Sequence, residues 1–209
     1  MAAFLGNFRN VMIAGLVLAI IMIVAFGKAS QGGFDVLFWQ AVLRWVHVFF
    51  GILWIGLLYY FNFVAARKTP EIPAELRPAL TKYITPEALF WFRWAALGTV
   101  LAGICVALLH GADYAANVFT FGLARPSVGP TGGFVLMSVG VWLAIIMFLN
   151  VWVIIWPNQK KVLGLVEADA DAKAAAARIA GMASRVNTLL SLPMLTAMAM
   201  YETLFGTGV

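Results

Sequence analysis

The chain has 209 residues, of which 63% are hydrophobic and only 11% are charged. A soluble domain carries about 45–50% apolar and about 25% charged residues. A water-soluble fold of this size cannot hide so much apolar surface, because a good share of its exterior has to be polar. The composition therefore excludes an ordinary soluble domain and predicts an all-α fold, a polytopic bundle of helices in the lipid bilayer.

The net charge of +5 does not point to nucleic acid. The basic residues gather in the connections beside apolar segments, as in membrane proteins, and no basic run is interleaved with aromatic residues. We therefore expect lipid, and no nucleic acid, as a partner.

Five apolar segments predict about five transmembrane helices in a single domain covering 1–209. The first is longer than the apolar region of a signal peptide and is followed by Lys28, so we expect a retained helix. The second far exceeds the roughly 20 residues that cross a bilayer, so it should tilt or project. The expected spans are 11–27, 36–66, 86–110, 133–156 and 187–205.

Local signals set several helix ends. Thr85, Pro86 and Glu87 form a capped start for the third span, and Pro157 should end the fourth. Pro193 lies inside the fifth, where a helix bundle tolerates a kink. Of the connections, 67–83 reads as a polar loop with three prolines, 111–132 as a loop rich in Gly, Ala and Pro, and 162–183 as a cytoplasmic amphipathic helix.

The basic residues predict an orientation. One side of the membrane receives only Lys28 and Arg125 outside the spans. Because basic residues favour the cytoplasm, we expect a cytoplasmic N-terminus and a periplasmic C-terminus in a bacterial inner membrane. Ten basic residues lie on the other side: Arg9, Arg67, Lys68, Arg77, Lys82, Lys160, Lys161, Lys173, Arg178 and Arg185.

Polar side chains inside the spans are the candidate site residues, because they are costly in lipid. A spacing of three and four residues places one set on a single face of the second span, which should face protein. That face is either a packing seam or the wall of a cofactor or substrate site. Its residues are Arg44, His47, Gly51, Trp54, Leu58 and Asn62.

Three polar residues are expected to have structural roles: Asn62, Asn150 and Glu202. Arg44 and Glu202 should lie at similar depth near the outer ends of their spans, so we expect an ion pair that offsets the desolvation of both. The lone Cys105 is expected to be a small core residue.

His47 and His110 are the only histidines. Their positions in the second and third spans differ by over roughly 10 Å along the membrane normal, which disfavours a haem with two histidine ligands. We expect His110 to be a residue of the helix end. His47 could still ligate a haem b alone, with Arg44 beside it.

Four sequence blocks resemble one known family. RWVHVFFGILWIG (44–56), EALFWFRW (87–94), NVWVIIWPNQKKV (150–162) and SRVNTLLSLPML (184–195) are similar to the membrane domain of bacterial membrane-bound urate hydroxylases, the urate oxidase N-terminal domain. The resemblance implies a helical bundle able to host a redox centre, in proteins that oxidise urate and pass electrons to a cytochrome c domain.

This chain departs from the family pattern. Histidines of the family correspond here to Ser138, Val186 and Tyr201, whereas His47 matches, and these 209 residues hold no CxxCH motif. We therefore favour a non-catalytic integral membrane subunit without a cofactor, docked in a larger redox or photosynthetic membrane complex. The alternatives are a haem-b or quinone-linked oxidoreductase using His47 and Arg44, and a small-solute transporter or channel lined by the face from Arg44 to Asn62.

Overall fold

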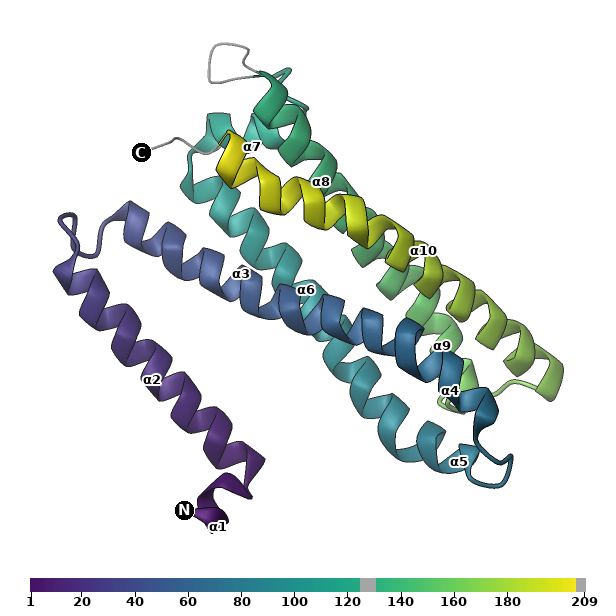
Figure 1. The fold of residues 1–209 in the computed structure, drawn as a ribbon. Coiled ribbons are helices and arrows are strands. Elements are labelled where there is room, and N and C mark those ends of the chain that lie inside the picture. The colour runs from purple at the N-terminus through teal and green to yellow at the C-terminus, as the bar shows by residue number, and fades with distance from the viewer. Residues whose placement is uncertain (125–130, 206–209) are drawn as a thin grey trace.

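The computed structural model describes residues 1–124 and 131–205, which form helices and no β-strand (Figure 1). This confirms the all-α prediction. Four helices of the described chain are long and apolar enough to cross a membrane: Phe8–Ala29, Val36–Glu71, Arg77–Leu109 and Gly132–Val162. The protein is therefore a helical membrane protein.

The first span, α2 (Phe8–Ala29), follows the short helix α1 (Ala2–Leu5) and stands apart from the other helices (Figure 1). The Asn7 side chain caps it by accepting from the backbone N–H of Asn10. Only 6% of its most apolar stretch is buried, and Gly27 at its end meets the rings of Phe34 and Phe38. α2 is thus attached to the bundle only near its carboxyl-terminal end.

The second span runs through α3 (Val36–Tyr59), the π-helix η1 (Tyr60–Ala65), α4 (Ala66–Lys68) and η2 (Thr69–Glu71). Asp35 caps α3 by accepting from the backbone N–H of Phe38 at 3.0 Å. The second span is one continuous helix of 36 residues, Val36–Glu71, so the unusual length expected from the sequence is confirmed. Its last turns project beyond the apolar stretch.

The third span begins earlier than the sequence indicated. α5 (Arg77–Ala79) and the π-helix η3 (Leu80–Ile84) lead without a break into α6 (Thr85–Leu109). Thr85 therefore does not cap a helix, and the prediction of a helix start there was wrong. The expected loop 67–83 is correspondingly short, with most of its residues helical.

The connection after α6 contains a helix that the sequence analysis missed. Gly111 adopts φ +109°, which an L side chain rarely allows, and this reverses the chain into α7 (Ala112–Phe119). α7 then packs against α6 and α8. Part of the predicted loop 111–132, including Arg125, lies outside the described residues.

The fourth span continues past Pro157. α8 (Thr131–Leu149) passes through the π-helix η5 (Asn150–Ile155) into α9 (Trp156–Val162). A proline interrupts the regular α-helical ladder, and here the wider π turn directly precedes it, so the helix direction is kept. The predicted end at Pro157 was therefore wrong.

The last helix, α10 (Ala170–Leu204), joins two segments that the sequence analysis treated separately. Asp169 caps it at 2.7 Å, and it continues through Pro193 without a break. The amphipathic segment and the fifth span thus form one helix, beginning at Ala170 rather than 162. α10 is not among the four helices that are apolar enough to cross a membrane on composition alone. It packs along α8, however, which is one of those four (Figure 1). This placement supports a fifth crossing.

The core lies where α3 and α6 pack together against η5 and α10. Trp54 and Leu58 are fully buried, and Ala95 and Ala96 allow the backbone of α6 to approach them. The single cysteine is not part of this core: Cys105 is exposed, so that prediction was wrong. Composition cannot separate lipid-facing from core positions here, because both are apolar.

Buried amides connect α10 to the neighbouring helices. Asn150 donates to Asn187 Oδ1 at 2.7 Å and to the carbonyl of Ala183 at 2.8 Å, and Asn187 donates to the carbonyl of Met147 at 3.0 Å. Asn62 donates to Ser184 Oγ at 2.8 Å. Such bonds between helices hold a bundle together in lipid, where water cannot satisfy these groups.

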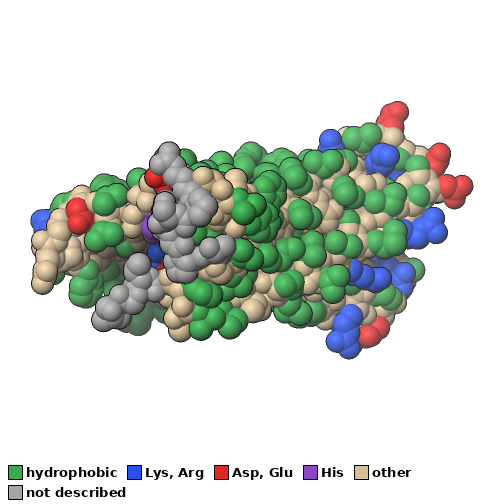
Figure 2. Space-filling view, turned by 90° about the horizontal axis from the view of Figure 1, so that it is seen from above, with side chains coloured by type: hydrophobic (Ala, Val, Ile, Leu, Met, Phe, Trp, Pro, Cys, Tyr) green, Lys and Arg blue, Asp and Glu red, His purple; other side chains and the backbone are tan. Residues whose placement is uncertain are grey.

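Most basic side chains gather at one end of the molecule, shown at the right of Figure 2. This end contains α4, α5, α9 and the start of α10 (Figure 1). The fold therefore brings together charged segments that lie far apart in the sequence.

Candidate functional site

A cavity of about 610 Å³ lies between α3, α6, α8 and α10, with residues of α7 also in its wall. Small-molecule sites have volumes of about 300–1000 Å³ and mostly apolar walls. The wall here is mostly aliphatic and methionine side chains, among them Ile55, Val100, Val141, Met194 and Met198. The cavity is thus large enough for a small organic ligand.

The polar stripe on the second span faces protein, as predicted. Arg44, His47, Gly51 and Trp54 contribute to the cavity wall. Leu58 is fully buried in the core, and Asn62 bonds to α10 beyond the cavity. The stripe is therefore a cavity wall in its first half and a packing seam in its second.

His47 is fixed against α6. Its Nδ1 lies 2.8 Å from the carbonyl oxygen of Thr99, and because a carbonyl only accepts, Nδ1 carries the proton and donates. In the neutral ring, Nε2 keeps its lone pair. A Cβ at Gly103 would lie 3.0 Å from the ring, so the glycine makes room for it.

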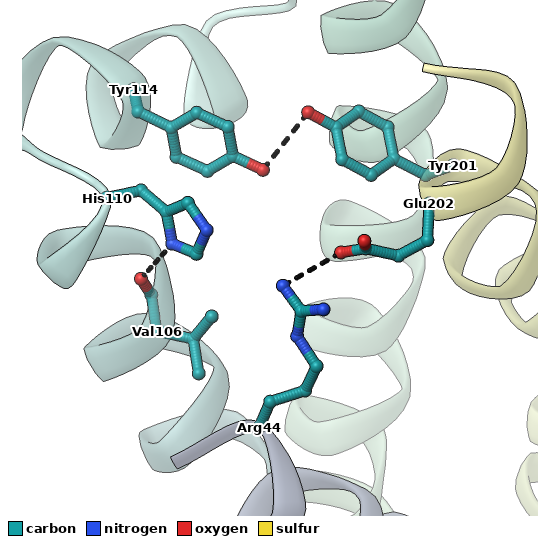
Figure 3. Close-up of polar contacts among 6 residues, drawn as sticks. All are labelled: Arg44, Val106, His110, Tyr114, Tyr201 and Glu202. Atoms are coloured by element: carbon teal, nitrogen blue, oxygen red, sulfur yellow. Dashed lines mark hydrogen bonds and ion pairs between the residues drawn. The ribbon is translucent and has the colours of Figure 1, made fainter. Parts of the chain in front are cut away.

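His110 is held at the end of α6 in the same way. Its Nδ1 donates to the carbonyl of Val106 at 2.8 Å, and its ring stacks on Tyr114 with centroids 4.8 Å apart (Figure 3). It also contributes to the cavity wall. The cavity thus extends from His47 to His110.

The two histidines do not fit one haem with two axial ligands. His47 bonds to Thr99, and His110 follows Thr99 by eleven positions, just past the end of α6, which is roughly 16 Å along the helix axis. Both axial ligands must bind the same iron atom. The separation along α6 is of the size expected from the sequence.

The predicted ion pair is present. Arg44 Nη2 lies 3.0 Å from Glu202 Oε1, and the two side chains come from α3 and α10 (Figure 3). They are 46% and 50% exposed, so the pair is only half shielded by protein. It places two opposite charges together at one end of the cavity.

Two tyrosines complete this polar end. The Tyr114 hydroxyl donates to the Tyr201 hydroxyl at 3.2 Å (Figure 3). Burial, and then this hydrogen bond, raise the pKa of Tyr114 above its usual value, so its phenol stays protonated at neutral pH.

Two features of the site were not predicted. The indole N–H of Trp54 is buried and has no acceptor among the described residues. Tyr59 also contributes to the cavity wall, and its hydroxyl hydrogen-bonds Ser191 Oγ at 3.0 Å. Trp54 stood in the polar stripe, but nothing in the sequence indicates that its N–H lacks a partner.

The fold and the cavity define a helical membrane domain with an internal apolar site. Residues 129–208 match the family model described as urate oxidase N-terminal. The chain is therefore similar to the urate oxidase N-terminal family, in agreement with the sequence blocks. The matched part contains α8, η5, α9 and α10, and the blocks at 44–56 and 87–94 lie outside it. No curated protein and no solved structure matches the chain.

The positions aligned with family histidines lie in different surroundings. Ser138 is fully buried and donates to the carbonyl of Val118 on α7. Tyr201 lies at the polar end of the cavity, beside Glu202. Val186 is 47% exposed on α10, so a side chain there faces outward.

We predict that Arg44 and Glu202 are coupled. Arg44→Met and Glu202→Gln should each lower the free energy of unfolding, and the double variant should lose less than the sum of the two. Because both side chains are half exposed, we expect a coupling free energy of about 1 kcal/mol. Denaturant titration of the purified variants in detergent micelles measures it. Additive losses would contradict the ion pair.

Proposed function

We propose that this chain is a non-catalytic integral membrane subunit, built on a fold like the urate hydroxylase membrane domain. It docks with other membrane subunits in a larger redox or photosynthetic complex of a bacterial inner membrane. The observation that carries the proposal is α2, a span of 22 residues of which almost nothing is buried by the rest of the chain.

The composition of α2 supports a helix as its partner. Gly15 and Ala19 lie four residues apart on one face, and a Cβ at Gly15 would meet nothing within 4 Å. Small residues at this spacing let two transmembrane backbones approach closely. Large apolar side chains, including Leu18 and Ile21, cover other positions on α2. The Gly15–Ala19 pair is therefore of the kind that is enriched where two transmembrane helices dock.

The charge distribution supports a cytoplasmic N-terminus. Most basic residues of the second to fifth spans lie at one end of the bundle (Figure 2), the end that contains α4, α5, α9 and the start of α10. Basic residues favour the cytoplasmic side, so this end should face the cytoplasm. α7 and the end of α10, at the opposite end (Figure 1), should face the periplasm.

The docking role is tested by Gly15→Leu. In native membranes solubilised gently, the wild type should run on a native gel as a species larger than one chain, and Gly15→Leu should release the single chain. Gly181→Leu on α10 is the matched control, because Gly181 also has open space around it. A Gly15→Leu protein that keeps the size of the wild-type species would reject docking through α2.

Topology is tested by single cysteines in a Cys105→Ala background. Lys173→Cys should resist a membrane-impermeant thiol reagent in intact cells, and Gln31→Cys should react. Lys173 lies at the basic end and Gln31 in the connection between α2 and α3. Both cysteines should react after the cells are broken. The opposite pattern in intact cells would reverse the orientation.

We also propose that the protein binds no haem and does not oxidise urate alone. His47 offers a single Nε2, and His110, eleven positions after Thr99 in sequence, lies too far along the helix axis to ligate the same iron. The purified protein should show no Soret band, and His47→Ala should lower the melting temperature without changing the visible spectrum. A Soret band that disappears in His47→Ala would establish a haem ligand and favour the oxidoreductase alternative.

A further inference from the structure

We propose that the cavity between α3, α6, α8 and α10 binds the ring of a lipid-soluble quinone or quinol that enters from the bilayer. This inference concerns binding alone and does not depend on docking through α2.

The cavity reaches the lipid-facing surface between α3 and α10. Ile52 on α3 and Leu195 on α10 both contribute to its wall, yet they are 69% and 38% exposed. α3 is part of a membrane span, so this opening faces lipid rather than water. A ligand dissolved in the bilayer can therefore enter sideways and leave an apolar tail in the opening.

The polar end of the cavity carries both hydrogen-bond donors and acceptors. A guanidinium has several N–H donors, and the ion pair with Glu202 engages one terminal nitrogen of Arg44. His47 and His110 each donate through Nδ1 to a backbone carbonyl, which leaves Nε2 of the neutral ring as an acceptor. Quinone oxygens accept hydrogen bonds and quinol hydroxyls donate them, so both redox forms find partners.

The charges favour a neutral ligand. Glu202 neutralises Arg44 at a distance of 3.0 Å, and a carboxylate or phosphate headgroup would have to displace it or lie beside it. Repulsion between like charges opposes that arrangement. A fatty acid or an anionic phospholipid is thus disfavoured relative to an uncharged ring.

The aromatic groups favour a flat ring. His110 and Tyr114 stack at 4.8 Å, and both contribute to the cavity wall. Trp54 also contributes to this wall and adds another aromatic side chain, although its indole N–H is shielded from the cavity.

Gly51 provides the test. A Cβ at this position would meet its nearest neighbour, Thr99 Cγ2, at 3.8 Å, which is an ordinary contact. Gly51→Leu should therefore fill the cavity without a clash near the backbone. Ala144→Leu fills it from α8, on another side, and serves as the second variant. Gly181→Leu, on α10 outside the cavity wall, is the control.

The probes are decylubiquinone and decylubiquinol, titrated by equilibrium dialysis against the full-length protein in detergent. We expect saturable binding to the wild type and to Gly181→Leu, and binding weakened about tenfold or more in Gly51→Leu and Ala144→Leu. Circular dichroism establishes that each variant compared is folded. Organic extracts of the protein purified from native membranes should contain a quinone.

Two results would overturn the proposal. The first is a binding result: either the folded wild type shows no saturable binding, or the cavity-filling variants that fold bind with wild-type affinity. The other is an extract that holds stoichiometric phospholipid or fatty acid, together with failure of decylubiquinol to displace it. Neither result bears on the native-gel experiment with Gly15→Leu, so the docking proposal stands or falls separately.

Discussion

The candidate site depends on how α3 and α10 are tied to each other. The antiparallel helices are joined by the Arg44–Glu202 pair near one end and by the Tyr59–Ser191 and Asn62–Ser184 hydrogen bonds toward the other. Between these ties, roughly 20 Å of α3 faces the cavity. Gly51 and Gly56 add no side chain to the cavity wall in this stretch of α3. The ties therefore keep the helices together while the space between them stays open.

The same constraint explains where the polar residues lie. Lipid cannot satisfy a hydrogen-bonding group, so each polar side chain in the spans needs a partner within the protein. α10 meets this need with Ser184, Asn187 and Ser191, which face α3 and η5. These residues also lower the mean hydropathy of α10, which is why it is not among the four most clearly apolar helices although residues 187–205 were predicted as a span.

The sequence predicted the features that follow from periodicity and charge. The inward face from Arg44 to Asn62 and the Arg44–Glu202 pair follow from helical spacing and the cost of polar groups in lipid. Helix ends were less predictable. In water, Thr85 would favour a helix start and Pro157 a helix end. In this bundle each is preceded by a π-helix, and the helix continues through both positions. Burial was also less predictable, as Cys105 shows. Positions that face lipid and positions that face the core both carry apolar residues, so the sequence does not distinguish them.

The cavity itself could not be predicted, because it arises from what α3 and α10 leave unfilled. A pattern that places His47, Gly51 and Trp54 on one face fits a close packing seam as well as a cavity wall. The path of α10 decides between a packing seam and a cavity wall. α10 contacts the second span through Ser184 and Ser191, and it contacts α3 again through the ion pair of Arg44 and Glu202. An arginine and a glutamate can span a gap that serine and asparagine cannot. Long charged side chains on both helices form one tie, whereas α10 contributes only serines to the other, and this difference fits a wider separation of the helices at the end that carries Arg44, His110 and Tyr114.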